Sequence, residues 1–149
     1  MTTLRIEVTD TPAEADAAYI VAQTRAYNRG YTPRDVRILC VFARADDDCL
    51  IGGLTAITYW QFLEVDYLWV DQDHRRRGHG ARLMAAAEAE ALQRGCRQAL
   101  VDTFSFQALG FYQALGYQEF GRLAGFCGQY DRHYLRKVLL AGPTGPSGN

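Results

Sequence analysis

The fold and the functional site of this chain are best read from one stretch, 70-VDQDHRRRGHGARLM-84. Three arginines run into two glycines spaced Gly78-x-Gly80, directly after an apolar run and directly before an alanine-rich segment. A strand, a glycine-containing turn and a strong helix in this order leave unbonded backbone N–H groups at the start of the helix, where the helix dipole is positive. The stretch therefore predicts an anion site, with a solvated arginine-rich loop as the alternative.

The two glycines favour phosphate as the anion. Glycine lets a ligand oxygen approach the backbone closely, and neighbouring arginines add charge-assisted hydrogen bonds. A dinucleotide-binding G-x-G-x-x-G motif would need glycine at position 83, where leucine stands, and no G-K-[ST] follows. The loop therefore differs from both of the common nucleotide-binding loops.

The composition narrows the class of protein. The chain has 149 residues, of which 48% are hydrophobic and 22% charged, and its net charge is −1. These values fit one globular domain, expected over residues 1–140, and argue against binding nucleic acid by bulk electrostatics. The four cysteines lack metal-ligand spacing, so no metal site is expected. With no leader or membrane-length apolar run, we expect a cytoplasmic protein without membrane contact.

The periodicity on both sides of the opening stretch predicts an α/β (α+β) fold. The order β-α-β-β-β-α-β-α-β-β indicates a mixed, mostly antiparallel sheet of about six or seven strands flanked by helices. The Gly/Pro/Ser-rich tail 141–149 is expected to be flexible. The predicted elements are a strand at 4–8, a helix at 10–28 with an aspartate cap, strands at 37–44, 50–61 and 62–70, helices at 81–95 and 106–115 separated by a strand at 98–104, and strands at 117–126 and 131–139.

The strand predicted at 62–70 carries two acids. Strict alternation places Glu64 and Asp66 on one side together with Leu68 and Val70. A carboxylate on such a strand can act as a general base if a reacting amine lies beside it. A solvated carboxylate with no chemical role is the alternative.

Two motifs resemble a known family. Arg75-x-x-Gly78-x-Gly80, after a strand and at the opening of a long helix, resembles the [Q/R]-x-x-G-x-[G/A] signature of the GNAT superfamily of acyl-CoA-dependent N-acyltransferases. About thirty residues on, 108-ALGFYQALGY-117 resembles the A-x-x-F-Y-x-x-x-G-[FY] segment of the same family. The resemblance covers nearly the whole chain, and residues 101–121 resemble a branch of small bacterial acetyltransferases, some of which act on antibiotics.

The resemblance implies acetyl-CoA as co-substrate and no metal. It places the pyrophosphate of coenzyme A at the arginine–glycine loop and the pantetheine arm along main-chain groups at the end of the preceding strand. Serine at position 105 stands where the family usually has an asparagine that contacts this arm. The cofactor-binding residues so implied are Leu68, Trp69, Val70, Arg75, Arg76, Arg77, Gly78, His79, Gly80, Ala81, Ser105 and Gln107.

The resemblance also implies catalytic roles. Tyr112 matches the tyrosine that protonates the departing thiolate, and a phenol with an ordinary pKa near 10 remains protonated at working pH. Aromatic packing alone is the alternative for this residue. Glu64 stands where some relatives have a catalytic glutamate, with Asp66 as second choice and a water chain as the other route.

The acceptor is expected to be the primary amine of a small molecule, acetylated by direct attack in a ternary complex. Two alternatives stay open: a protein N-terminus or lysine as acceptor, and an acyl-CoA-binding sensor without turnover. Many relatives form homodimers through their later strands, but the sequence carries no decisive interface signal. Whether acyl groups other than acetyl are used is equally open.

Overall fold

The computed structural model describes residues 1–140, so the predicted tail 141–149 lies outside the described residues. The chain divides into two compact units, the first ending at Arg34 and the second beginning at Asp35. A single domain over residues 1–140 stays a prediction.

The first unit contains one helix, α1 (Glu14–Arg29), which confirms the predicted helix. Its start differs from the prediction, because Ala13 occupies the N-cap position and no side chain caps the helix. The strand predicted at 4–8 is wrong, since residues 1–9 have no regular secondary structure. Alternation supplies an apolar face, but a strand also needs a partner for its backbone hydrogen bonds, which the alternation of residues 4–8 does not provide.

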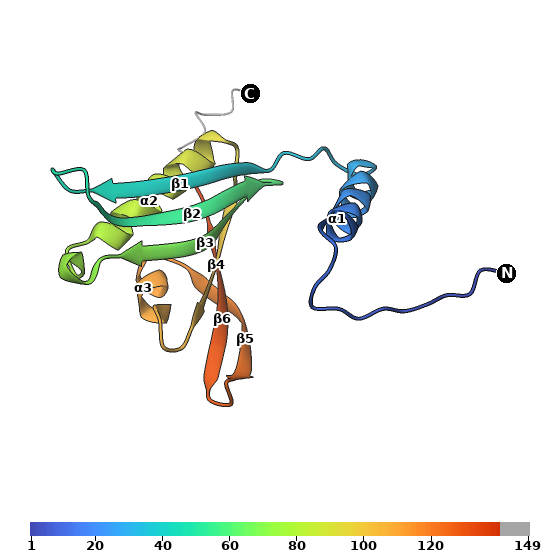
Figure 1. Ribbon diagram of the computed structural model, residues 1–149. Helices are drawn as coiled ribbons and strands as arrows, with labels where there is room; N and C mark the ends of the chain where they lie inside the picture. The colour runs from blue at the N-terminus through green and yellow to red at the C-terminus, as the bar shows by residue number, and fades with distance from the viewer. Residues whose placement is uncertain (141–149) are drawn as a thin grey trace, which may run out of the picture. The chain divides into compact units, whose positions relative to one another are not determined.

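The second unit is built on one six-stranded sheet in the order β1-β2-β3-β4-β6-β5 (Figure 1). All neighbouring strands are antiparallel except β3 and β4, which are parallel. The mixed, mostly antiparallel sheet is therefore confirmed. The strands are β1 (Arg37–Arg44), β2 (Leu50–Tyr59), β3 (Phe62–Val70), β4 (Gln98–Phe104), β5 (Gln118–Phe126) and β6 (Tyr130–Val138).

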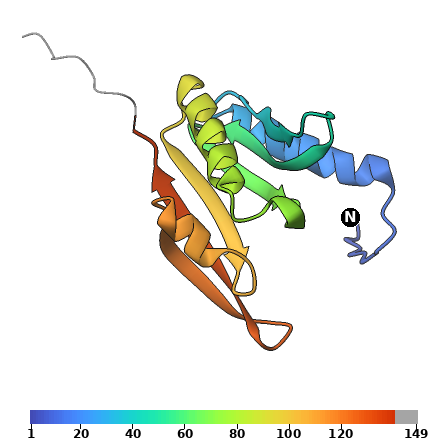
Figure 2. The ribbon, with the colours of Figure 1, turned by 90° about the vertical axis from the view of Figure 1, so that its left-hand side faces the viewer.

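Three helical segments belong to the second unit: η1 (Gln72–His74), α2 (His79–Gln93) and α3 (Leu109–Ala114). Figure 2 shows α2 and α3 on the same face of the sheet. The parallel pairing of β3 and β4 requires a crossover connection, and α2 provides it while burying its apolar stripe against the sheet. No helix within residues 1–140 is long and apolar enough to cross a membrane.

The core lies between α2 and the sheet. Met84, Ala87 and Ala91 of α2 have no measurable exposure, and they face strand residues such as Leu63 and Leu135 that are equally buried. The alanines keep the helix close to the sheet, because they add no bulk between the two layers. Gly95 and Gly116 follow α2 and α3 at φ angles of 84° and 93°, a left-handed backbone that ends a helix readily.

The parallel pair β3 and β4 separates along its length. Only residues 62–64 of β3 pair with residues 98–100 of β4, and the remaining residues of the two strands have no mutual ladder (Figure 2). The sheet is thus open between the C-terminal ends of β3 and β4. This opening, called the β3–β4 gap below, positions the candidate site.

A β-bulge at Asp66 corrects the predicted faces of β3. Thr55 pairs with Tyr67 and Ala56 with Val65, so Asp66 is an extra residue in the ladder. Beyond the bulge the alternation is inverted, and Leu68 lies across from the buried Leu54 on the side of α2. Glu64 therefore does not share a face with Leu68 and Val70, contrary to strict alternation.

Candidate active site at the gap between β3 and β4

The loop that follows β3 is held by its own first residues. The Asp71 carboxylate accepts a hydrogen bond of 3.1 Å from the Asp73 N–H and lies 3.0 Å from Nδ1 of His74. The hydrogen bond to His74, followed by that from Asp73, lowers the pKa of Asp71 below its ordinary value. Asp71 therefore stays charged and fixes the short helix η1 at the entrance of the loop.

The start of α2 presents free backbone donors. The first intrahelical hydrogen bond runs from the Arg82 N–H to the Gly78 carbonyl, so the N–H groups of His79, Gly80 and Ala81 have no acceptor within the helix. Gly78 has φ 81° and Arg76 has φ 62°, and these left-handed residues turn the chain into the helix. The arrangement suits a phosphate group at the positive end of the helix dipole.

Basic side chains of this loop and of the first turns of α2 are unpaired within the described residues. Within residues 1–140, the side chains of Arg76, Arg77, His79 and Arg82 make no ion pair and no hydrogen bond with other protein groups. Arg75 differs, because its Nε donates a hydrogen bond of 2.9 Å to the carbonyl oxygen of Val70, the last residue of β3. The loop can therefore offer charge to an anion without first breaking protein contacts.

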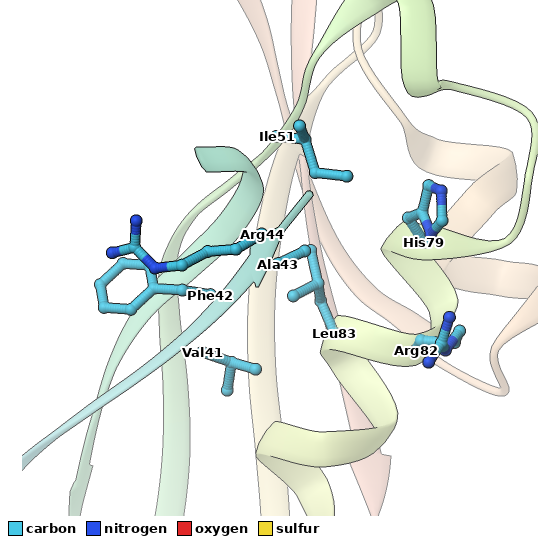
Figure 3. A pocket seen from close by; sticks show the side chains of 8 residues that line it. All are labelled: Val41, Phe42, Ala43, Arg44, Ile51, His79, Arg82 and Leu83. Carbon is cyan, nitrogen blue, oxygen red and sulfur yellow. The ribbon is translucent and has the colours of Figure 1, made fainter. Parts of the chain in front are cut away.

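A cavity of about 360 Å³ lies beside the start of α2 (Figure 3). Ile51 and Leu83 contribute apolar walls, while His79 and Arg82 line it from the first turns of α2. Arg44 also lines it, but its guanidinium is engaged by the Asp48 carbonyl at 3.1 Å. The cavity extends the cationic surface of the loop toward β1 and β2.

Gly80 has a packing role that the sequence did not indicate. A Cβ at this position would lie 3.1 Å from Cζ of the Phe111 ring on α3. A Cβ at Gly78 would meet no atom within 4 Å. Gly78 is thus required by its backbone conformation and Gly80 by the close approach of α2 to α3.

Main-chain groups of β3 face the β3–β4 gap. The Asp71 N–H donates to the Ile51 carbonyl at 2.8 Å, which fixes the phase of the β2–β3 ladder. Because hydrogen-bonded and non-bonded pairs alternate in an antiparallel ladder, Leu68 and Val70 turn their N–H and C=O groups away from β2. The Trp69 main chain points toward β2 instead. Of these three residues, Leu68 offers its N–H and C=O to a ligand in the gap and Val70 offers its N–H, because the Val70 carbonyl already accepts from Arg75.

Acidic side chains gather on the face of the sheet opposite α2. Partial desolvation, followed by repulsion from Glu64 and Asp102, raises the pKa of Asp66. The Tyr59 hydroxyl is hydrogen-bonded to Glu64, and this bond and partial burial raise the pKa of Tyr59. Asp102 is paired with Arg132, whose Nη2 lies 2.6 Å from the carboxylate. Within residues 1–140, neither Glu64 nor Asp66 has a basic partner.

Tyr112 lies on the other side of the sheet, within α3. Its side chain is 7% exposed, and its ring packs edge-on against Phe111 and Tyr117 at centroid distances of 5.1 and 5.8 Å. Burial, followed by repulsion from Asp102, raises the pKa of Tyr112 above 10. The phenol is thus held in its protonated form.

The polar residues at the end of β4 are engaged with the protein. The Ser105 hydroxyl accepts a hydrogen bond of 3.2 Å from the Asp131 N–H, and the Gln107 Oε1 accepts one of 2.9 Å from the Phe104 N–H. Ser105 keeps its hydroxyl proton for a further bond, and Gln107 keeps its amide N–H groups. Both residues therefore shape the turn between β4 and α3.

The family model for the acetyltransferase (GNAT) family matches residues 6–117, which is most of the chain. The chain belongs to the GNAT family. It is accordingly an enzyme that uses acetyl-CoA as its acetyl donor.

Individual relatives agree with this assignment. The chain is 39% identical over 107 residues to the blasticidin-S acetyltransferase of Streptomyces morookaense, covering 71% of this chain and 79% of that protein. It is 37% identical over 113 residues to an acetyltransferase of Agrobacterium fabrum, covering 75% and 82% of the two chains. The crystal structure of an acetyltransferase from Bacillus cereus has a TM-score of 0.82 at 28% identity, covering 89% and 98%.

The GNAT motifs include the loop and Tyr112, but they do not include two nearby residues, Arg82 and Thr103. Arg82 lines the cavity beside the loop, one turn into α2. Thr103 is 2% exposed at the end of β4 and bonds to the turn that carries α3. A signal for Thr103 exists in the sequence, since it continues the buried positions of Ala99 and Val101, where a hydroxyl needs a partner.

Proposed function

We propose that this enzyme transfers the acetyl group of acetyl-CoA to a primary amine of a small molecule, by direct attack within a ternary complex. The observation that carries the proposal is the β3–β4 gap, which has the cationic loop at its end, Glu64 on one face of the sheet and Tyr112 on the other. A thioester in such a gap is accessible to a nucleophile from one face and to an acid from the other.

The loop from Arg75 to Ala81 would hold the pyrophosphate of coenzyme A. The free N–H groups at the start of α2 and the unpaired Arg76 and Arg77 fit two phosphate groups in charge and in donor number. Arg82 enlarges the positive field along the cavity, and His79 adds ring nitrogens that can bond to an anion or to water. These features support the placement of the cofactor at this loop. Gly78 and Gly80 would keep the backbone close to the phosphate groups.

The pantetheine arm and the thioester would lie in the β3–β4 gap. Leu68 and Val70 turn main-chain donors and acceptors toward it, and an amide N–H there can stabilise the oxyanion that forms as the amine attacks. Ser105 and Gln107, at the end of β4, retain donors for the arm. Trp69 would contribute its side chain and not its backbone.

Glu64 is the proposed base. An amine must lose a proton to become a nucleophile, and a carboxylate can take this proton directly or through water. Asp66 is the second candidate, and its raised pKa makes it a stronger proton acceptor than an ordinary aspartate. The two carboxylates also favour a cationic amine as acceptor, because their charge attracts the ammonium form before deprotonation.

Tyr112 is the proposed acid. As the new C–N bond forms, the nitrogen gives up its second proton to solvent; the C–S bond breaks, and the thiolate of coenzyme A takes the phenolic proton of Tyr112, which is restored from solvent. The raised pKa of Tyr112 keeps that proton available up to alkaline pH. The base and the acid then serve opposite faces of the same carbonyl carbon.

A small-molecule acceptor is supported by the relatives. The most informative is the Streptomyces morookaense protein, whose name states that it acetylates blasticidin S, at 39% identity over 107 residues. We propose an acceptor of this general kind, a small compound with a primary amine and net positive charge. The acidic face that carries Glu64 and Asp66 agrees with that choice.

The test is a comparison of kcat/KM for acetyl-CoA-dependent acetylation of blasticidin S, aminoglycosides, polyamines and N-terminal peptides. The proposal predicts a kcat/KM at least about 100-fold higher for one of the small cationic amines than for every peptide, a difference of about 2.7 kcal/mol in transition-state binding. The reverse order would make a protein the acceptor. Acetyl-CoA binding without turnover of any amine would indicate a sensor.

A further inference from the structure

The turn between β4 and α3 is closed by one buried threonine. The Thr103 Oγ1 accepts a hydrogen bond of 3.1 Å from the Ala108 N–H, and it donates to the Gln107 Oε1 at 3.4 Å. The same Gln107 oxygen accepts a bond of 2.9 Å from the Phe104 N–H. These two side chains, which we call the Thr103–Gln107 clamp, join the last residues of β4 to Ala108, the residue that precedes α3.

The clamp is continuous with the backbone of Tyr112. Ala108, which bonds to Thr103 through its N–H, uses its carbonyl to accept the Tyr112 N–H at 3.2 Å. The Tyr112 carbonyl in turn accepts the Tyr117 N–H at 3.1 Å. Two hydrogen bonds therefore separate the Thr103 hydroxyl from the main chain of Tyr112.

The environment of the clamp makes it rigid. Thr103 is 2% exposed, so its hydroxyl bonds are shielded from competing water. The α3 helix has only the six residues Leu109–Ala114, and no side chain caps it at Ala108. A helix of this length is not stable by itself, so its position depends on the contacts at its ends and on its packing.

We propose that Thr103 and Gln107 are positioning residues that set the placement of Tyr112 at the β3–β4 gap. The inference rests on the proposed role of Tyr112 as the acid. The clamp does not touch the reacting atoms, and it acts by fixing the angle at which α3 leaves β4. A displacement of an acid by about 1 Å can cost as much as 100-fold in rate, so the loss of the clamp should appear in kcat.

The first measurement compares Thr103→Val with Thr103→Ser and with Thr58→Val as control. Thr58 is 4% exposed, and its hydroxyl accepts a bond of 3.1 Å from Arg94, so Thr58→Val also removes a buried hydroxyl bond but far from α3 in the chain. Both valine variants should lose thermal stability. Only Thr103→Val should lower kcat, by about tenfold, with the KM for acetyl-CoA within about twofold of the wild-type value. Thr103→Ser keeps the hydroxyl group, so this variant should have a kcat close to that of the wild type.

The second measurement is a double-mutant cycle with Tyr112→Phe. If Thr103 acts through Tyr112, then Thr103→Val should lower kcat in the wild type and leave it unchanged in the Tyr112→Phe background. An equal loss of kcat in both backgrounds, or an equal loss for Thr58→Val, would overturn the positioning role. An unchanged kcat and pH profile for Tyr112→Phe alone would overturn the role of Tyr112 as the acid, and the inference with it.

Discussion

The Nε atom of Arg75 donates a hydrogen bond of 2.9 Å to the carbonyl oxygen of Val70. This bond closes the loop between β3 and α2, because it joins Arg75, the first residue of the Arg75-x-x-Gly78-x-Gly80 motif, to the last residue of the strand beside the gap. The charge of Arg75 is thus used in two ways, to fix the loop and to add to its positive field.

Arg75→Lys should weaken coenzyme A binding although it keeps the charge. Lysine has no Nε donor in a planar fork, so the bond to Val70 is lost and the loop is less ordered. We expect the Kd of coenzyme A, measured by isothermal titration calorimetry, to rise about tenfold, as for the loss of one charge-assisted hydrogen bond. Arg77→Lys is the control, since Arg77 has no partner within the described residues. Equal effects of the two variants would contradict the role given to Arg75.

Gly78→Ala should reduce stability through the backbone alone. The φ angle of 81° is unfavourable for any residue with a Cβ, while no atom lies within 4 Å of the position that the Cβ would take. The expected loss in free energy of unfolding is about 1–2 kcal/mol, measured by urea denaturation. Gly110→Ala, inside α3 and with equally free space, should be neutral or stabilising. A loss for Gly110→Ala as large as that for Gly78→Ala would refute the explanation.

Gly80→Ala should be destabilising for a different reason, the contact of its Cβ with Phe111. The separation of 3.1 Å requires the Phe111 ring to shift, and we expect a cost of about 1 kcal/mol. Replacing Phe111 by leucine in the same chain should remove most of that cost, so the two changes should be non-additive in a denaturation cycle. Additive effects would show that Gly80 does not approach α3 as described.

Tyr117→Phe should stabilise the protein, most clearly in alkali. Among the described residues, the Tyr117 hydroxyl is the buried side-chain group that lacks a hydrogen-bond partner. Burial, followed by repulsion from Glu88, raises the pKa of Tyr117 far above 10. The neutral form is therefore required in the folded state, and stability present below pH 10 is lost as pH rises, because the unfolded chain releases the proton first.

The measurement for Tyr117 is the urea midpoint between pH 8 and pH 11. Tyr117→Phe should raise the free energy of unfolding by about 1 kcal/mol at pH 8, from removal of an unpaired buried hydroxyl, and by more at pH 11. Tyr67→Phe is the control, since Tyr67 is 77% exposed. A lower stability of Tyr117→Phe at pH 8 would mean that the hydroxyl has a partner in solution.

Local sequence patterns predicted most of the sheet of the second unit. The strand at 98–104 has the predicted bounds, because buried and less buried residues alternate along it without interruption. The predicted faces of β3 are wrong beyond Asp66. The bulge there depends on the pairing with β2, and the alternation of apolar and polar residues does not reveal it. The prediction of a strand at 4–8 is wrong for a related reason. Alternation describes one face of a segment and does not supply a pairing partner.

The candidate site was less predictable than the sheet. Motif spacing predicts roles for the loop and Tyr112 and close ligand approach at Gly80, and these stay predictions; it does not predict that a Cβ on Gly80 would lie 3.1 Å from Phe111. Gln107 was predicted from its place after β4 to bind the cofactor, and its Oε1 bonds to the Phe104 N–H. Side chains that serve a turn and side chains that serve a ligand are of the same types, so only the contacts distinguish them.

The most direct test of the central claim is the stoichiometry of acetyl transfer. Wild-type protein is incubated with acetyl-CoA and each of a series of small cationic primary amines, and free thiol and N-acetylated product are measured together, by a thiol reagent and by mass spectrometry. At least one amine should give equal amounts of coenzyme A and N-acetyl product, at a rate that depends on the concentration of amine. Thiol release no faster than background hydrolysis with every amine would contradict it.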